Sequence, residues 1–126
     1  MRYVLDTTFV IDHLRNDRAA VHKFASIFED GDEVFVNEVV VCEAWTGAHL
    51  VGDPDLEALL QVIEFVRPAA LQARAAGRWR AEARARGWSL GLADALVAAC
   101  ADSLDAAVLT RNARDFALTP VRVETY

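Results

Sequence analysis

Four acidic residues stand where the surrounding sequence predicts burial, and together they could hold a metal ion. Two of them, Asp6 and Asp115, follow the ends of expected strands, and the other two, Glu43 and Asp94, lie in apolar helical segments. A buried carboxylate without a partner is costly, so such groups are usually paired or metal-bound. Clustered carboxylates with no lysine or histidine beside them suit Mg²⁺ or Mn²⁺, which prefer oxygen ligands. Such cations polarise phosphates and activate water, so the expected chemistry is hydrolysis of a phosphodiester bond.

Each acid also has an ordinary structural explanation. Asp6 could cap the helix that follows it, and Asp94 could complement the dipole of its own helix. Glu43 could pair with an arginine, and Asp115 could close a turn with Asn112. All four explanations together are less convincing than each one by itself. Two of the acids follow strand ends, and the other two lie on helices that could pack against the same edge of the sheet.

The alternation of short apolar runs with helical patterns predicts the elements that must position these acids. Strands are expected at residues 3–5, 34–36, 64–66, 106–109 and 121–123, the last at a sheet edge. Helices are expected at about residues 9–14, 18–28, 38–49, 56–63, 69–86 and 92–102, with a turn or single helical turn at 114–116. Such alternation implies βαβ crossovers, hence a three-layer α/β/α fold with a mainly parallel sheet of four to five short strands. Asp6 then lies at the carboxyl end of a strand, where open α/β sheets bind their ligands.

Composition limits the class of protein. The 126 residues fit one domain, residues 1–126, and the apolar fraction of 54% is typical of a soluble protein. No apolar run approaches the roughly 20 residues of a membrane helix, and the acid at position 6 argues against a signal peptide. Cys42 and Cys100 lie in apolar segments, so both are expected to be small core residues in a reducing cytoplasm.

The distribution of charge bears on nucleic-acid binding. A net charge of −6 argues against passive coating of phosphates, yet residues 67–88 carry six arginines against a single acid. Arg78 and Arg84 are therefore candidate contacts to RNA, with Trp79 and Trp88 nearby for stacking on bases. A merely solvated helix face would have the same composition.

Four segments of the chain resemble those of PIN domains, in their order and spacing. They are Val4-Leu5-Asp6-Thr7-Thr8, Val41-Cys42-Glu43-Ala44-Trp45-Thr46-Gly47, Leu92-Ala93-Asp94-Ala95-Leu96-Val97-Ala98-Ala99 and Leu109-Thr110-Arg111-Asn112-Ala113-Arg114-Asp115-Phe116. The resemblance covers essentially the whole chain and is strongest to the VapC-type toxins of type II toxin–antitoxin pairs. Two departures leave the acids untouched: Thr8 stands where Ser or Asn is common, and Trp45 where Leu is common.

The resemblance implies a compact α/β/α fold and a Mg²⁺-dependent endoribonuclease. It implies Asp6 and Asp94 as direct metal ligands, with Glu43 and Asp115 completing the shell directly or through water. It suggests that Thr8 and Asn112 orient water or phosphate. The implied partners are an RNA substrate, a cognate antitoxin that covers the active site, and a second copy of the chain in a homodimer.

Three alternatives remain open at this stage. A phosphotransfer domain would need a lysine beside the acids, and Lys23, in an early helix, is badly placed for that role. A degenerate nuclease domain could serve only for binding, although the presence of all four acids argues against this. A PIN-type nuclease could process RNA without an antitoxin, and a small antitoxin-like reading frame just upstream would favour the toxin instead.

Overall fold

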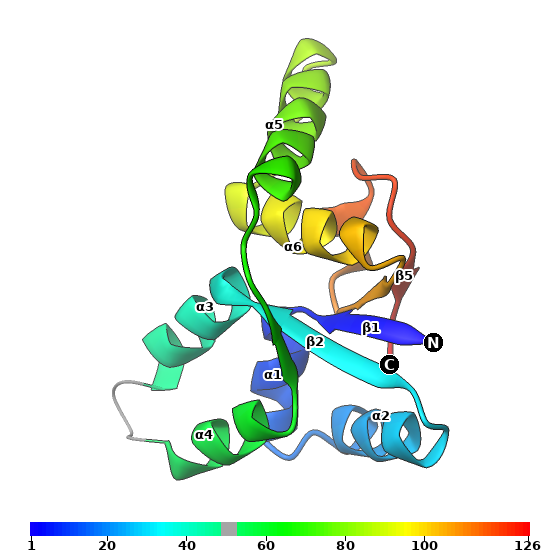
Figure 1. The fold of residues 1–126 in the computed structure, drawn as a ribbon. Helices are drawn as coiled ribbons and strands as arrows, with labels where there is room; N and C mark the ends of the chain where they lie inside the picture. Colours follow the sequence, from blue (N-terminus) through cyan, green and yellow to red (C-terminus); the bar gives the residue numbers. More distant parts are fainter. Residues whose placement is uncertain (49–52) are drawn as a thin grey trace.

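Five short parallel strands form a single sheet at the centre of the molecule, seen in a computed structural model that describes residues 1–48 and 53–126 (Figure 1). The strands are β1 (Arg2–Leu5), β2 (Glu33–Asn37), β3 (Glu64–Val66), β4 (Ala107–Leu109) and β5 (Val123–Glu124). Their order is β3-β2-β1-β4-β5, and every neighbouring pair is parallel. The expected sheet is therefore confirmed.

Helices cover both faces of this sheet. They are α1 (Thr7–Leu14), α2 (Arg18–Glu29), α3 (Glu38–Ala48), α4 (Pro54–Gln61), α5 (Ala70–Ala85) and α6 (Leu92–Ser103), with a 3₁₀ turn, η1 (Ala113–Phe116). Helix α6 lies on one face with α5 packed outside it, and α1 and α2 lie on the other face (Figure 1). Helix α3 sits beyond the strand ends and contacts both α1 and α6. The three-layer architecture expected from the sequence is confirmed.

Strand β1 is central because its residues are apolar on both faces. Tyr3 pairs in register with Val34 on β2 and with Ala107 on β4. Val4 and Leu5 are fully buried, as expected for a strand covered by helices on both sides. The main hydrophobic core therefore surrounds β1 and ends where Asp6 begins.

The order of the strands fixes where a ligand can enter. From β1 the chain moves outward through β2 to β3, and then returns to the other side of β1 to form β4 and β5. The carboxyl ends of β1 and β4 therefore flank the point at which the winding reverses, which is the usual ligand crevice of an open α/β sheet. This edge lies to the left in Figure 1, opposite the end of β1 at which the chain begins.

A few element boundaries differ from those expected. Helix α1 begins at Thr7 without an intervening turn, because the backbone carbonyl of Asp6 accepts bonds from Phe9 N (3.1 Å) and Val10 N (3.3 Å). The last strand is displaced to Val123–Glu124. His49, at the end of the helix expected over residues 38–49, lies outside the described residues. No helix within residues 1–48 and 53–126 has the length and apolarity needed to cross a membrane.

Candidate active site

Asp6 is the buried anchor of the site, with 6% of its surface exposed. Its side chain makes no capping bond to α1, so the expectation of a simple cap is wrong. Instead, Oδ2 accepts hydrogen bonds from Thr8 Oγ1 at 3.0 Å and from Thr110 Oγ1 at 2.8 Å. Oδ1 has no partner among the described residues, so this oxygen is free to face a ligand.

The two hydroxyls are themselves held by the loop that follows β4. Thr8 Oγ1 accepts a bond from the backbone N–H of Arg111 at 3.2 Å, and Thr110 Oγ1 accepts one from the backbone N–H of Asn112 at 3.0 Å. Each hydroxyl thus receives a backbone hydrogen and directs its own hydrogen at Asp6. The result is a fixed link between the ends of β1 and β4, across the point where the winding reverses.

Glu43 approaches the same edge from α3. Its carboxylate accepts a hydrogen bond from Thr7 Oγ1 at 2.7 Å. Thr7 is the first residue of α1, so consecutive hydroxyls at the start of this helix orient acids from two different elements. Sequence reasoning missed both Thr7 and Thr110; the signal for each was a hydroxyl next to a strand end.

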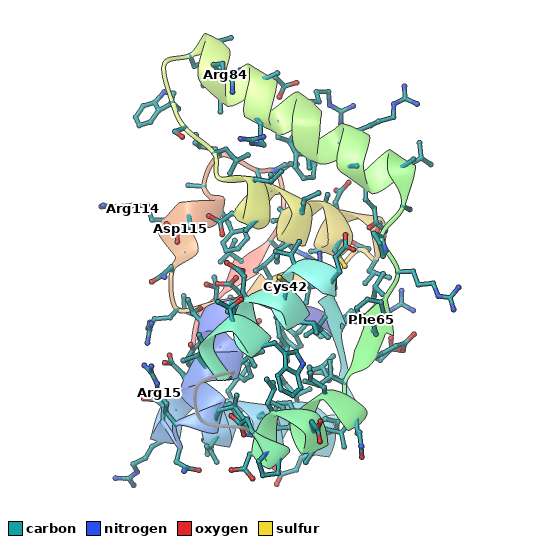
Figure 2. All side chains as sticks on the ribbon, turned by 90° about the vertical axis from the view of Figure 1, so that its left-hand side faces the viewer. Arg15, Cys42, Phe65, Arg84, Arg114 and Asp115 are labelled. Carbon is teal, nitrogen blue, oxygen red and sulfur yellow. The ribbon has the colours of Figure 1, made fainter. Side chains whose placement is uncertain are left out.

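Asp94 lies in the first turn of α6 and is half-buried. Burial, together with the negative charges of Asp6, Asp115 and Glu43, raises the pKa of its carboxyl group to about 6. The carboxyl group therefore senses all three other acids. This mutual repulsion is the clearest sign that the structure brings the four predicted residues to one edge, which faces the viewer in Figure 2.

Burial of the four acids was overestimated from the sequence. Only Asp6 is buried, whereas Glu43 and Asp115 are exposed. On α3 the core contacts are made by Val40 and Ala44, four residues apart on one helix face. Glu43 and Cys42 therefore point elsewhere, and the expectation that Cys42 is a core residue is wrong. Cys100 is fully buried, as expected.

The donor set suits a hard divalent cation. All four side chains offer carboxylate oxygens, the ligands that Mg²⁺ and Mn²⁺ prefer. Within residues 1–48 and 53–126, however, no three His, Cys, Asp or Glu side chains are gathered closely enough to enclose an ion. The arrangement is open rather than cage-like, which fits an ion that keeps several of its own waters, as Mg²⁺ usually does.

A second buried acid supports the loop after β4, and sequence reasoning did not predict it. Asp12 on α1 is 6% exposed. Its carboxylate pairs with Arg111 Nη1 at 2.6 Å and accepts a bond from the Tyr126 hydroxyl at 2.7 Å. Burial and the bond to Asp12 raise the pKa of Tyr126. Because the N–H of Arg111 also holds Thr8, this network steadies the loop beside the acids.

The other predicted site residues are less closely tied to the acids. Among the described residues, the side chain of Asn112 makes no hydrogen bond, although its backbone helps to hold Thr110. Arg78 forms an exposed pair with Glu82, 4.0 Å apart on α5. Arg84 lies near the end of the same helix (Figure 2). Trp79 is only 5% exposed and packs in the core, so the expectation that it could stack on bases is wrong.

The chain matches the family model described as PIN domain over residues 3–121. With this fold and this edge of carboxylates, the chain belongs to the PIN domain family. It is 32% identical to Ribonuclease VapC19 of Mycobacterium tuberculosis over 117 residues, which cover 93% of this chain and 94% of that protein.

Solved structures show the same fold at lower identity. VapBC2 from Rickettsia felis bound to a DNA fragment from its promoter gives a TM-score of 0.87 at 20% identity, covering 100% of this chain and 99% of that chain. DNA-bound VapBC from Salmonella typhimurium gives a TM-score of 0.85 at 23% identity, covering 99% of this chain and 98% of that chain.

Proposed function

We propose that this protein is a Mg²⁺-dependent endoribonuclease, able to use Mn²⁺ instead, and the toxic component of a type II toxin–antitoxin pair. The observation that carries the proposal is the shared electrostatic field of Asp6, Glu43, Asp94 and Asp115 at the reversal point of a PIN-family sheet. The likeness to a relative named as a ribonuclease supports the choice of RNA as substrate.

In this proposal Asp6 and Asp94 bind the ion directly, while Glu43 and Asp115 complete its shell. When bound, the ion would stabilise negative charge on the phosphate and lower the pKa of water. Three threonines orient two of the ligands: Thr8 and Thr110 hold Asp6, and Thr7 holds Glu43. Fixed ligand orientation of this kind is usually worth a factor of about 10–100 in metal affinity.

Other residues would position the reacting groups. Thr8 lies beside Asp6, and Asn112 follows the loop, so these two are proposed to orient water or phosphate. A proton on Asp94 would compete with the ion, because metal ligands must be deprotonated to bind. With a pKa of about 6, this carboxyl group is mostly ready to bind a cation at neutral pH.

The proposal is tested by incubating the purified protein with end-labelled single-stranded RNA. We expect internal cleavage with Mg²⁺ or Mn²⁺ and none in EDTA, because in this proposal the bound ion activates water for phosphodiester hydrolysis. Asp102→Asn is a matched control, since Asp102 is an exposed acid near the far end of α6. If the RNA stays intact with both ions, the protein is better explained as a binding module without catalytic activity.

We further propose that an antitoxin covers the acidic edge and inserts a cation there. Asp94 and the three like charges around it favour an arginine or lysine from a partner whenever the metal is absent. Several solved structures with this fold are VapBC toxin–antitoxin complexes, which supports a partner of this kind.

Co-expression with the small protein encoded just upstream is expected to give a co-purifying complex that does not cleave RNA. The measurement is cleavage by the complex and by the released toxin, at equal concentrations and with Mg²⁺ present. A complex that cleaves at the full rate would contradict inhibition at this edge. The absence of any partner would favour an RNA-processing nuclease that acts alone.

The whole chain is proposed to act as one domain, in the cytoplasm, and as a homodimer. The family model covers residues 3–121, which leaves little of the chain for anything else. Two apolar side chains near the free edge of the sheet are exposed: Phe65 on β3 by 50% and Leu71 on α5 by 75%. Exposed apolar groups of this size suit a contact between copies of the chain.

A further inference from the structure

A small recess lies between the end of α5 and the start of α6. It has a volume of about 40 Å³ and is lined by Arg80, Arg84, Trp88, Ser89 and Leu90. Two of these side chains are cationic, one is a large aromatic group, and none is acidic. This combination is unusual on a protein with a net charge of −6.

The backbone holds Trp88 in a fixed place. Helix α5 ends in a Schellman motif, in which Gly87 adopts a φ of 79°. Trp88 N donates to the carbonyl of Ala83 at 2.9 Å, and Gly87 N donates to that of Arg84 at 3.0 Å. The side chain of Trp88 is nevertheless 62% exposed. The hydrogen-bonded backbone therefore presents a large aromatic side chain whose face is open to solvent.

The arginines supply the matching charge. Arg80 Nε donates to the carbonyl of Leu90 at 3.1 Å, which fastens the loop to α5 and leaves its terminal nitrogens to other partners. Arg84 is exposed and forms no ion pair among the described residues. An indole face beside two guanidinium groups fits a nucleotide, whose base can stack while its phosphate accepts hydrogen bonds.

The loop that lines the recess runs directly into α6, the helix that carries Asp94. Leu90 lines the recess, and the next residue, Gly91, lies so close to Asp94 that a Cβ at position 91 would be 3.4 Å from Asp94 Oδ2. Consecutive Cα atoms are only about 3.8 Å apart. Leu90 and Asp94 are only four positions apart in the chain, so a single strand with one phosphate at the acids can extend toward the recess.

We propose that the surface around this recess binds one nucleotide of a single-stranded RNA whose scissile phosphate lies at the acids, with the base stacked on the exposed face of Trp88 and its phosphate on Arg84. The inference rests on the proposed ribonuclease function and adds a subsite to it. The proposal also assigns different roles to two arginines of α5. Arg84 contacts RNA, whereas Arg78, which pairs with Glu82 one turn away, contributes little.

The test measures binding of a short, fluorescently labelled oligoadenylate by anisotropy in EDTA, so that cleavage plays no part. An abasic oligomer with the same number of phosphates is measured in parallel. Trp88→Ala should weaken binding of oligoadenylate about 5- to 150-fold, the usual range for loss of one stacked base. The variant should bind the abasic oligomer as tightly as the unmutated protein does, and Trp88→Phe should restore most of the affinity.

Arg84→Gln should weaken binding of both oligomers and reduce the slope of log K against log[salt] by about 0.7, as for one lost phosphate contact on a single strand. Arg78→Gln is the matched control and should change neither quantity. The binding assay does not depend on cleavage. A protein that binds RNA through Trp88 but does not hydrolyse it would therefore refute the ribonuclease proposal and leave the binding site standing.

Three results would overturn the subsite: unaltered binding of oligoadenylate by Trp88→Ala, an equal loss for the abasic oligomer, or no binding of RNA by the unmutated protein. A further result would reassign the recess. If Trp88→Ala loses the co-purifying partner protein but keeps its affinity for RNA, the recess is a protein contact and the nucleotide subsite is wrong.

Discussion

Asp94→Asn is expected to abolish RNA cleavage and, at the same time, to make the metal-free protein more stable. Cleavage should fall by at least about 100-fold, since even residues that merely orient a metal ligand are worth about 10–100. Stability should rise because the substitution removes a half-buried charge that three other carboxylates repel. We expect a gain of roughly 1–2 kcal/mol near neutral pH, after allowing for screening by water.

The gain in stability from Asp94→Asn should increase as pH rises. The pKa of Asp94 is about 6 in the folded chain and 3.8 without its surroundings. The folded state therefore holds this proton more tightly, so the stabilisation it gives is complete below the lower value and is lost as pH rises through the higher one. The metal-free protein should lose stability through this group as pH rises from about 4 to about 7. Asp94→Asn should show much less of that loss.

Urea unfolding of both proteins, with Mg²⁺ and with EDTA, provides the measurement. Mg²⁺ should stabilise the unmutated protein, because the proposed ion site exists only in the folded chain, and should stabilise the variant far less. Asp102→Asn serves as the control on the same helix and should change neither cleavage nor the effect of Mg²⁺. If Asp94→Asn proves less stable in EDTA and still cleaves RNA, Asp94 merely complements the helix dipole.

Asp12→Ala should cost about 2–4 kcal/mol of stability, the largest loss we expect from any single polar substitution in this protein. The change removes a buried carboxylate that accepts bonds from both Arg111 and Tyr126, and hydrogen bonds to charged groups are worth about 1.5–3 kcal/mol each. The expected loss of stability is smaller than the sum of the two bonds, because the partly exposed Arg111 side chain can hydrogen-bond to water instead. The measurement is the midpoint of urea unfolding at neutral pH.

The matched control is Glu33→Ala, which breaks the ion pair between Arg2 and Glu33 on the surface. Exposed pairs contribute only about 0.2–1 kcal/mol, so this variant should unfold close to the unmutated protein. Asp12→Ala should also slow cleavage, because Arg111 no longer anchors the loop whose N–H holds Thr8. Equal stability of the two variants would show that the buried network contributes nothing.

The sequence was sufficient to predict the sheet and the helices, while the roles of the four acids stay a prediction. Apolar runs such as Tyr3–Leu5 are long enough to define strands, and Asp6 marks the end of the first one without ambiguity. What could not be predicted was which face of each helix is buried. The segment Val39–Cys42 is apolar all round, so its pattern gave no direction, and only packing through Val40 and Ala44 turns Glu43 outward.

Long-range polar contacts were the other part that sequence reasoning could not supply. Asp12 stands between Ile11 and His13 and looks like any polar position on a helix. Its burial depends on Arg111 and Tyr126, which lie 99 and 114 residues further along the chain. Thr110 is similar, since its hydroxyl matters only because β4 pairs with β1. Spacing within one segment carries no information about such partners.

The position of β4 beside β1 also bears on the order in which the protein forms. Strand β1 can pair with β2 soon after synthesis begins, but its other neighbour belongs to residues 107–109. The bond from Thr110 to Asp6 spans 104 residues, and contacts of this range form late because loop closure must precede them. A nascent chain that ends before residue 107 therefore lacks Thr110 and Asp115 and cannot assemble the acidic edge. Such a chain also exposes one side of β1 as an unpaired strand, which invites aggregation of prematurely terminated products.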